Sequence, residues 1–334
     1  MKKKFYMFAL SAALLVGGLA SCNGSKANAA EEDAVEAADS IPTVYYIKDI
    51  TPENLVKVYE ALGRKAEGRV GVKISTGESN KSNHLDTALI ADLVKLVNGT
   101  FIECNTAYAG NRNETEKHYQ TAKEHGFVDL AGVDIMDAEG DTVLTVGIPE
   151  GHLQNKNYVG NHINNYDFVV VLSHFKGHQM AGFGGALKNI SIGIGSSAGK
   201  TWIHTGGKTA DPAQIWGNTA EQKDFCESMA EAAKAVADHF GKNILYINVA
   251  NRLSVDCDCN GNPAEPKMSD FGVLASLDPV ALDQACLDMV FNSTDPGKDD
   301  LVERINSRMG THTVDHAAAI GVGSKEYKLV TITE

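Results

Sequence analysis

Short apolar segments rich in β-branched residues alternate with longer amphipathic segments along most of this chain, and no other feature restricts its fold as strongly. The short segments, predicted to be strands, are residues 43–47, 69–75, 100–104, 167–172, 244–250 and 272–276. Helices are predicted over residues 51–62, 86–98 and 225–240, and another begins at Asp278 and Pro279. Strands separated by helices of this length form βαβ units. The sequence therefore predicts an α/β fold, with a mostly parallel sheet and helices on both faces.

The predicted strand over residues 167–172 is followed by a run of polar and glycine residues. Ligands of open α/β sheets bind beyond the carboxyl ends of the strands, and the candidate catalytic residues here are His174, Lys176, His178, Lys188 and Asn189. Gly182, Gly184 and Gly185 let the backbone approach a cofactor or ligand closely and expose N–H groups. We expect these residues to converge on one crevice that suits a small anion. The alternative is a glycine-rich structural turn with solvated lysines, because the run matches neither the P-loop nor the dinucleotide-binding pattern.

The stretch DCDC, residues 256–259, follows the predicted strand over residues 244–250. Cys257 and Cys259 are candidate metal ligands that need histidines beside them, because two thiolates alone do not complete a tetrahedral site. The alternative is a disulfide between them, as expected in an oxidising compartment. Because the carboxyl ends of parallel strands gather at one edge, we predict that the cysteine pair shares a crevice with His174 and His178. Lysines in that crevice would lower the pKa of the cysteines and favour thiolates.

Two further groups of residues follow from the same pattern. Three residues beyond the predicted strand over residues 100–104 are expected to line the same crevice: Asn105, Tyr108 and Arg112. His312 and His316 stand four residues apart and share one face of a helix if the segment is helical, with Asp315 as a candidate orienting carboxylate. Histidine pairs at this spacing more often lie at a surface than bind a metal.

Four stretches of the sequence resemble one known family: LSHFKGHQMAGFGGALKNISIGIGSSAGKTWIH, DCDCNG, LASLDPVALDQACLD and HAAAIGVGSKEYKLV. Together they are similar to domain-of-unknown-function family number 362, whose members are often labelled iron–sulfur-centre proteins, over nearly all of residues 43–330. The resemblance implies a shared α/β core. It also implies a site formed by the histidine and lysine run, the Lys188–Asn189 pair and the two cysteines, and it makes His204 a candidate cofactor-binding residue. It does not imply a reaction.

One difference from this family concerns the cofactor. Many members carry a ferredoxin-like insert with Cys-x-x-Cys spacings after the histidine that corresponds to His204, whereas this chain has no cysteine between Cys104 and Cys226. We therefore expect any cofactor to be a divalent transition metal rather than an iron–sulfur cluster. Cys104, Cys226 and Cys286 lie in strand-like or helical patterns and are predicted to be buried, unreactive thiols.

The N-terminal residues predict export and lipid attachment. Lysines at positions 2–4, an apolar run over residues 5–16 and the sequence LASC ending at Cys22 resemble a bacterial lipoprotein signal over residues 1–22, in which Cys22 is lipidated. The alternative is an ordinary secretory signal with an incidental cysteine. Residues 23–40 are small, polar and acidic, which is typical of a flexible tether. Residues 41–334 are expected to fold as one α/β domain, as a single unit or as two closely joined lobes.

Charge and location restrict the partners. The formal net charge of −13 argues against binding to nucleic acid. The expected location is the bacterial cell envelope, in the periplasm and lipid-anchored at the outer membrane, because Asn23 follows Cys22 in place of the aspartate that often retains lipoproteins at an inner membrane. The expected partners are a small anionic molecule and, through the lipid anchor, a membrane.

Two classes of function agree with these features. The first is a metal-dependent or redox enzyme that acts on a small anionic substrate, with a histidine as acid or base. The second is a non-catalytic lipoprotein that binds a metal or another small ligand. Bound metal without turnover of candidate anions would favour the second class.

Overall fold

The computed structural model describes residues 41–333, and residues 41–334 form one compact unit. The predicted signal peptide, its lipidation residue Cys22 and the predicted tether lie outside the described residues, so these remain predictions. Within the described part of the chain, no helix has both the length and the apolar character needed to cross a bilayer.

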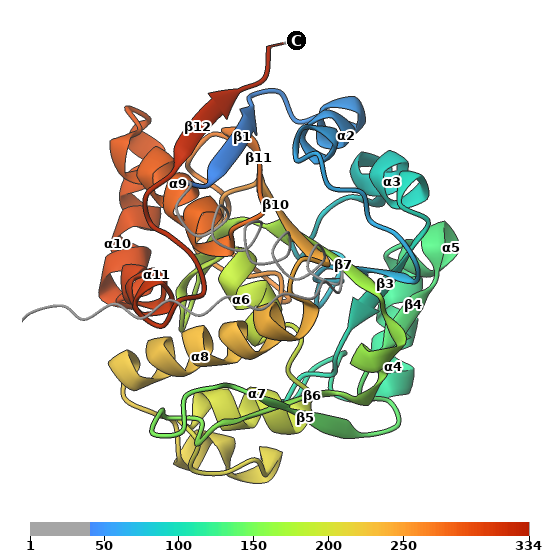
Figure 1. The fold of residues 1–334 in the computed structure, drawn as a ribbon, viewed down its shortest axis with the longest axis vertical. Helices are drawn as coiled ribbons and strands as arrows, with labels where there is room; N and C mark the ends of the chain where they lie inside the picture. The colour runs from blue at the N-terminus through green and yellow to red at the C-terminus, as the bar shows by residue number, and fades with distance from the viewer. Residues whose placement is uncertain (1–40, 334) are drawn as a thin grey trace, which may run out of the picture. The chain divides into compact units, whose positions relative to one another are not determined.

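One eight-stranded sheet forms the centre of the fold (Figure 1). Its strands are β1 (Thr43–Ile47), β2 (Val70–Lys73), β3 (Gly99–Glu103), β4 (Val133–Ile135), β7 (Phe168–His174), β10 (Ile244–Ala250), β11 (Gly272–Ser276) and β12 (Lys328–Thr331). Their spatial order is β12-β1-β11-β10-β7-β2-β3-β4. All neighbours in this order are parallel except the two pairs that β11 makes with β1 and β10. The predicted mostly parallel sheet is therefore confirmed.

Strand β11 runs antiparallel because of the segment that precedes it. Residues 251–271 connect β10 to β11 without a helix. A crossover helix is the usual way to bring a chain back to the starting end of a sheet, and a chain that lacks one returns in the opposite direction. This connection carries the two cysteines of the DCDC stretch across the carboxyl end of β10.

Helices cover both faces of the sheet, as the sequence predicts (Figure 1). One face packs against α2 (Pro52–Ala61), α3 (Thr87–Leu96), α4 (Thr115–Glu124) and α5 (Phe127–Ala131). The other packs against α6 (Ala186–Ser191) and α9 (Pro279–Asn292), and α8 (Gln222–Phe240), α10 (Asp299–Ser307) and α11 (Gly310–Ala319) pack on these two helices. In β7, Val169 and Val171 belong to one core, whereas Val170 and Leu172 belong to the core on the opposite face. Burial on both faces explains why this strand is a continuous apolar run.

Two of the predicted helix starts are confirmed by their caps, whereas α8 begins at Gln222, three residues before the predicted start, and has no side-chain cap. Thr51 precedes Pro52, and its side-chain oxygen accepts a hydrogen bond from the backbone N–H of Asn54. Asp278 caps α9 in the same way and accepts from the backbone N–H groups of Val280 and Ala281. Such a cap satisfies backbone donors that the first helical turn leaves unpaired, which typically contributes about 1 kcal/mol.

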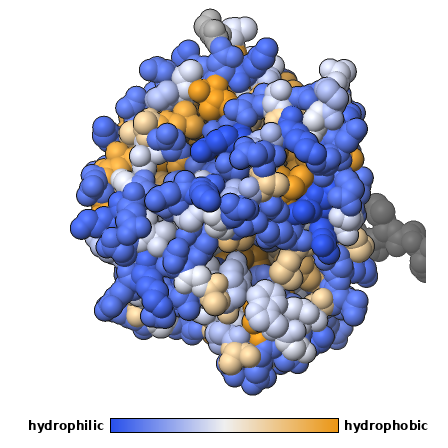
Figure 2. All heavy atoms as spheres, turned by 180° about the vertical axis from the view of Figure 1, so that it is seen from behind, coloured by the Kyte–Doolittle hydropathy of each residue, from blue (hydrophilic) through white to orange (hydrophobic). Residues whose placement is uncertain are grey.

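A smaller layer lies beside the main sheet, where the hairpin of β5 (Asp141–Thr145) and β6 (Lys156–Gly160) meets α7 (Ser197–His204). Trp202 of this layer packs with Phe225 and Met229 of α8 in a third apolar core. Short 3₁₀ helices cover residues Asn161–Asn165, Pro212–Gly217 and Pro296–Lys298. The face of the molecule shown in Figure 2 is mostly hydrophilic, with apolar residues in small groups. This agrees with the formal net charge of −13 of the chain.

Candidate functional site

A pocket of about 80 Å³ opens at the carboxyl edge of the parallel strands. Three neighbouring strands each end on a polar residue that lines it: β2 ends at Lys73, β3 at Glu103 and β7 at His174. These strands are parallel neighbours in the sheet, so their last residues meet at one edge. The pocket therefore lies where ligands of open α/β sheets bind.

The predicted loop after β7 is more ordered than the sequence suggests, and this corrects the prediction. Strand β7 continues through His174, and β8 (Lys176–His178) pairs antiparallel with β9 (Gly182–Gly184) before α6 begins. Gly177 in this hairpin lies directly against the connection that carries the cysteines. A Cβ atom at Gly177 would fall 2.5 Å from the carbonyl oxygen of Val255, which is closer than real Cβ atoms approach. Glycine at this position thus lets the hairpin and the cysteine segment pack together.

Asp258 connects the hairpin to the cysteine segment through two buried contacts. Its Oδ1 lies 2.8 Å from Nδ1 of His174, and its Oδ2 accepts a hydrogen bond of 2.8 Å from Nζ of Lys176. Burial disfavours the charged carboxylate, but Lys176 and His174 outweigh this effect and hold the pKa of Asp258 well below its usual range. The other ring nitrogen of His174, Nε2, lies 2.6 Å from the carbonyl oxygen of Asn251. Both ring nitrogens thus face acceptors.

Glu103 is the second buried carboxylate that lines the pocket. It accepts a hydrogen bond of 3.0 Å from Nζ of Lys73 and lies 3.4 Å from Nη1 of Arg112, which also pairs with Glu78 at 3.1 Å. Burial opposes the charge of Glu103, yet the two cations lower its pKa to about 2. Asn189 joins this group to β7, because its Oδ1 accepts from Lys73 at 3.1 Å and its Nδ2 donates to Ser173 at 3.0 Å.

Lys188 differs from the other cations of the pocket. Within residues 41–333, its Nζ makes no hydrogen bond and no ion pair, whereas Lys200 donates to the carbonyl oxygens of Gly195 and Cys104. Burial by surrounding protein, followed by repulsion from Lys176 and Lys73, lowers the pKa of Lys188 to about 7. The positive side chains that line the pocket are Lys73, Arg112, Lys176, Lys188 and Lys200, and its carboxylates are Glu103 and Asp258. The pocket thus carries an excess of positive charge.

Cys257 and Cys259 line the same pocket and are joined by a disulfide. The sequence leaves metal binding and a disulfide open, and in this structure the sulfur atoms are oxidised, so they are not thiolate ligands. His178 lies beside them: one of its ring nitrogens and the two sulfur atoms are all within 4.8 Å of one another. Its Nδ1 accepts hydrogen bonds from the backbone N–H groups of Met180 and Ala181. Burial, with the nearby Lys188 and Lys176, lowers the pKa of His178 well below its usual value, so its ring is neutral.

Most of the residues predicted for the site lie together. The predicted residues that line the pocket are His174, Lys176, Gly184, Gly185, Lys188, Asn189, Cys257 and Cys259. His178 does not line the pocket but lies beside the disulfide. Two predicted cofactor-binding residues do not line the pocket. Gly182 has a positive φ of 80° and packs against the backbone of Gly310, and His204 is buried beside Phe225 with its Nδ1 2.6 Å from the carbonyl oxygen of Lys200.

The residues beyond β3 are placed only in part as expected. Tyr108 and Arg112 line the pocket, but Asn105 turns away and bonds to Thr115 and His118. Three lining residues, Lys73, Glu103 and Lys200, were not among the predicted site residues. A signal for the first two is present, because each is a charged residue at the end of an apolar strand, in VGVK and GTFIE. Cys104, Cys226 and Cys286 are buried free thiols, as expected.

No curated protein matches the chain. Among solved structures, the lactate racemase apoprotein from Thermoanaerobacterium thermosaccharolyticum is similar with a TM-score of 0.42 and 17% identity, over 74% of this chain and 56% of that one. A protein from Thermotoga maritima is similar with a TM-score of 0.38 and 15% identity, over 71% of this chain and 57% of that one. The chain thus spans little more than half the length of either structure.

The family assignment rests on a sequence match that covers the pocket. The family model described as "Domain of unknown function (DUF362)" matches residues 70–288, a range that runs from β2 into α9. It includes the histidine hairpin, Lys188 and the cysteine pair. Because the match covers more than half of the chain, this protein belongs to the DUF362 family.

Proposed function

We propose that this protein is held in the cell envelope by a lipid at Cys22 and binds a small anionic molecule, a carboxylate or a phosphate, in the pocket at the carboxyl edge of the sheet. The observation that carries the proposal is Lys188. Both carboxylates of the pocket are already paired, Asp258 with His174 and Lys176, and Glu103 with Lys73 and Arg112. The amine of Lys188 is left without a partner within the described residues.

The space in front of Lys188 supports this proposal. A Cβ atom at Gly184 would lie 3.6 Å from Nζ of Lys176 and 3.8 Å from Cδ of Lys188. Glycine at this position keeps the region between the two lysines open. An anion there would offset the burial and the repulsion that together lower the pKa of Lys188, and a charge-assisted hydrogen bond forms at low energetic cost in a site that is already shaped. The small volume of the pocket favours an anion of a few heavy atoms over a nucleotide.

Isothermal titration calorimetry at constant ionic strength tests this proposal. The ligands are inorganic phosphate and a series of two- to four-carbon carboxylates, and the variant is Lys188→Met, which keeps the length of the side chain but removes its charge. We expect affinity to fall at least about tenfold, equivalent to about 1.4 kcal/mol. Lys57→Met is the matched control, because Lys57 is exposed on α2. Equal loss in both variants, or no anion bound by the unmodified protein, would refute the proposal.

A second candidate function is favoured by the group formed by His178, Cys257 and Cys259. Two-electron, two-proton reduction of the disulfide by a dithiol would produce two thiols beside a neutral imidazole. Two thiolates and one imidazole are a ligand set that zinc accepts in catalytic sites, with a fourth position left for water or substrate. To bind zinc, His178 would have to give up the hydrogen bonds that its Nδ1 accepts from Met180 and Ala181, which frees one ring nitrogen. In that form the protein would be a metal-dependent enzyme acting on the anion held by Lys188. Without it, the protein is a binding lipoprotein.

Metal analysis of two redox states distinguishes these alternatives. We expect the reduced protein to take up one more equivalent of Zn²⁺ in this pocket than the oxidised protein, and the double variant Cys257→Ser, Cys259→Ser to lose the difference. Turnover of the bound anion only after reduction and metal loading would identify the enzyme. Equal metal content in both redox states would refute the metal-dependent enzyme but would not contradict the anion-binding function.

A further inference from the structure

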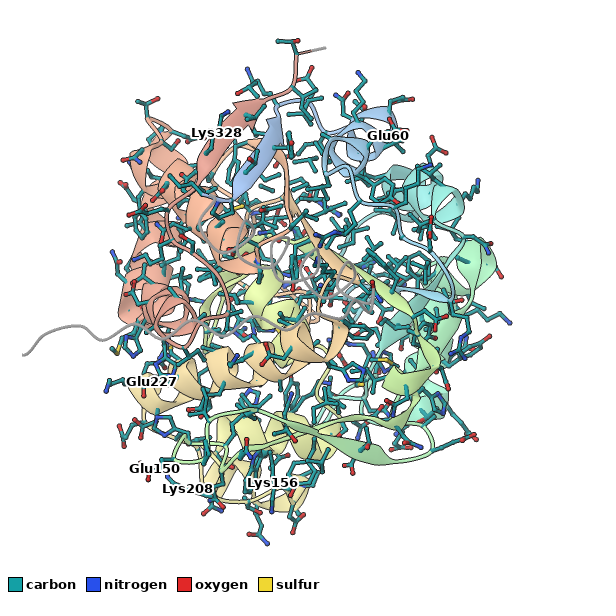
Figure 3. All side chains as sticks on the ribbon, viewed as in Figure 1. Glu60, Glu150, Lys156, Lys208, Glu227 and Lys328 are labelled. Carbon is teal, nitrogen blue, oxygen red and sulfur yellow. A yellow bond between two sulfur atoms is a disulfide. The ribbon has the colours of Figure 1, made fainter. Side chains whose placement is uncertain are left out.

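A second group of histidines and carboxylates lies outside the pocket, where α8, α11 and the turn before β6 meet. Its members are His152, Asp224, Glu227, Glu231, His312 and His316. None of them lines the pocket described above. Figure 3 labels Glu227 near one end of α8, close to α11. The sequence predicts only that His312 and His316 share a helix face, and their helix α11 is confirmed.

The two helices bring complementary residues together through the same spacing. Glu227 and Glu231 lie four residues apart on α8, and His312 and His316 lie four residues apart on α11, so each pair shares one helix face. The histidine pair does not use Asp315 as its orienting carboxylate, because Asp315 pairs with Lys325. This corrects the expectation from the sequence and leaves Glu227 as the carboxylate that His312 faces.

Glu227 is the centre of the group. One of its oxygens, Oε2, lies 2.7 Å from Nε2 of His152. The other, Oε1, lies 2.9 Å from Nε2 of His312 and 4.0 Å from Nδ1 of His316. A carboxylate oxygen of Asp224 lies within 4.8 Å of the ligand atoms of both His152 and Glu227. One imidazole and two carboxylates thus lie close enough to share an ion, whereas Oε1 of Glu227 faces His312 and pairs with Lys223 at 3.3 Å.

Glu231 positions the third histidine. Its two carboxylate oxygens accept hydrogen bonds from the backbone N–H groups of His152 and Leu153, at 3.0 and 2.9 Å. These bonds fix the turn that carries His152 beside α8. Because Glu231 already accepts these backbone hydrogen bonds, it acts as a positioning residue and not as a ligand.

His316 shows that the hydrogen bonding of the group is incomplete. Its Nε2 is buried and has no hydrogen-bond partner within the described residues, and the nearest carboxylate oxygen, on Glu231, is 4.0 Å away. Its ring stacks on that of His312, with centroids 6.4 Å apart. A set of imidazoles that served only as hydrogen-bond donors to Glu227 would not need this third ring.

We propose that His152, Asp224 and Glu227 form a site for a divalent transition metal such as Zn²⁺, with Oε2 of Glu227 as its ligand atom and His312 holding Oε1 in place. Imidazole nitrogens and carboxylate oxygens bind Zn²⁺ at about 2.0–2.2 Å, which separates two tetrahedral ligands by about 3.3 Å. The observed separation of 2.7 Å between Nε2 of His152 and Oε2 of Glu227 needs to open by only about half an ångström.

The ligand chemistry and the exposure agree with this assignment. Nitrogen ligands favour zinc and its neighbours over Mg²⁺ and Ca²⁺, which prefer all-oxygen sites. The side chain of His152 is 30% exposed, so an ion can reach it from solvent. Bound there, the ion would connect α8 to the turn that carries His152, and it would stabilise the folded state by mass action.

Zinc titration of the purified, oxidised full chain tests the site. We expect one equivalent of Zn²⁺ to bind and to raise the thermal midpoint of unfolding, with no such rise in Mg²⁺. The variant Glu227→Gln keeps the size of the side chain and should reduce zinc affinity at least tenfold, and the double variant His152→Gln, Asp224→Asn should abolish it. His162→Gln is the matched control, because His162 also contacts two carboxylates, Asp134 and Glu139, but these three described residues do not bring their ligand atoms together within 4.8 Å.

A further control separates this site from the pocket. The triple variant His178→Gln, Cys257→Ser, Cys259→Ser should still bind this equivalent, whatever the outcome for the proposed function. Unchanged zinc binding in Glu227→Gln would overturn the assignment, as would wild-type protein that takes up no zinc. A circular dichroism spectrum equal to that of the unmodified protein shows that a variant has folded, and Glu227→Gln provides the result if the double variant at His152 and Asp224 does not fold.

Discussion

Replacing Asp258 by asparagine should be the most destabilising conservative change in the pocket. The carboxylate is 1% exposed and contacts His174 and Lys176, each at 2.8 Å. Asparagine keeps the shape but loses the charge, so Lys176 remains a buried cation without its counter-charge. Breaking a buried ion pair on one side typically costs about 3–5 kcal/mol. We expect the lower part of this range, because the asparagine oxygen can still accept one hydrogen bond.

Urea unfolding followed by circular dichroism measures this loss as a change in the free energy of unfolding. Asp300→Asn is the matched control: Asp300 pairs with Lys267, but both side chains are at least half exposed, and such pairs are worth about 0–1 kcal/mol. The double variant Asp258→Asn, Lys176→Met should recover part of the loss, because neither charge is then left buried and unpaired. A loss below about 1 kcal/mol in Asp258→Asn would refute the reasoning.

The same contact has a definite pH dependence. The pKa of Asp258 is lowered in the folded state, so its contribution to stability is present above the unfolded pKa of about 4 and is lost as the pH falls. The stability difference between the wild type and Asp258→Asn should therefore shrink as the pH falls below about 4. A difference that stays constant into strong acid would show that the loss comes from packing and not from charge.

Three more outcomes are expected. Because the pKa of Lys188 is about 7, its amine is charged below that pH, and calorimetric anion affinity should weaken as the pH rises from 6 to 8.5; a flat profile in wild type would contradict this. Cys22→Ser should move the protein from the membrane to the soluble fraction, and unchanged retention would count against lipidation. Cys104, Cys226 and Cys286 are buried and their pKa values are raised by burial, so a thiol reagent should label them only in denaturant.

The fold was largely predictable because its signals are local. The buried strands appear as apolar runs, and β10 and β11 have the predicted bounds. Thr51 and Asp278 act as caps within a few residues of their partners. The antiparallel direction of β11 was harder to predict from the sequence. It depends on the absence of a helix in residues 251–271, which the alternation of strands and helices does not predict.

The site was only partly predictable because its contacts join distant parts of the chain. The carboxyl-edge rule correctly brings His174 and Cys257 to one pocket, although they are far apart in sequence. The same rule cannot say which side chain pairs with which. In the sequence, Asp258 is notable only because it lies between two cysteines, yet in the structure it contacts both His174 and Lys176. The role of Glu227 was not visible at all, since it requires α8 to lie against α11 and the turn at His152.

The balance of charge in the pocket gives the strongest reason to regard it as a binding site. A buried cation is tolerated when a carboxylate neutralises it, and the chain provides such partners for Lys73 and Lys176. Lys188 stands among these cations without one in the described residues, and its lowered pKa shows that its charge is disfavoured there. Groups with strongly shifted pKa values are concentrated at functional sites, because an unpaired buried charge does not stabilise the folded protein unless a ligand binds to it.

An apolar residue at position 188 would remove the repulsion at no evident cost to packing. We therefore expect Lys188→Met to be at least as stable as the wild type in the absence of anion, as measured by urea unfolding, while losing anion affinity. A variant that lost both stability and affinity would show instead that Lys188 has a structural role.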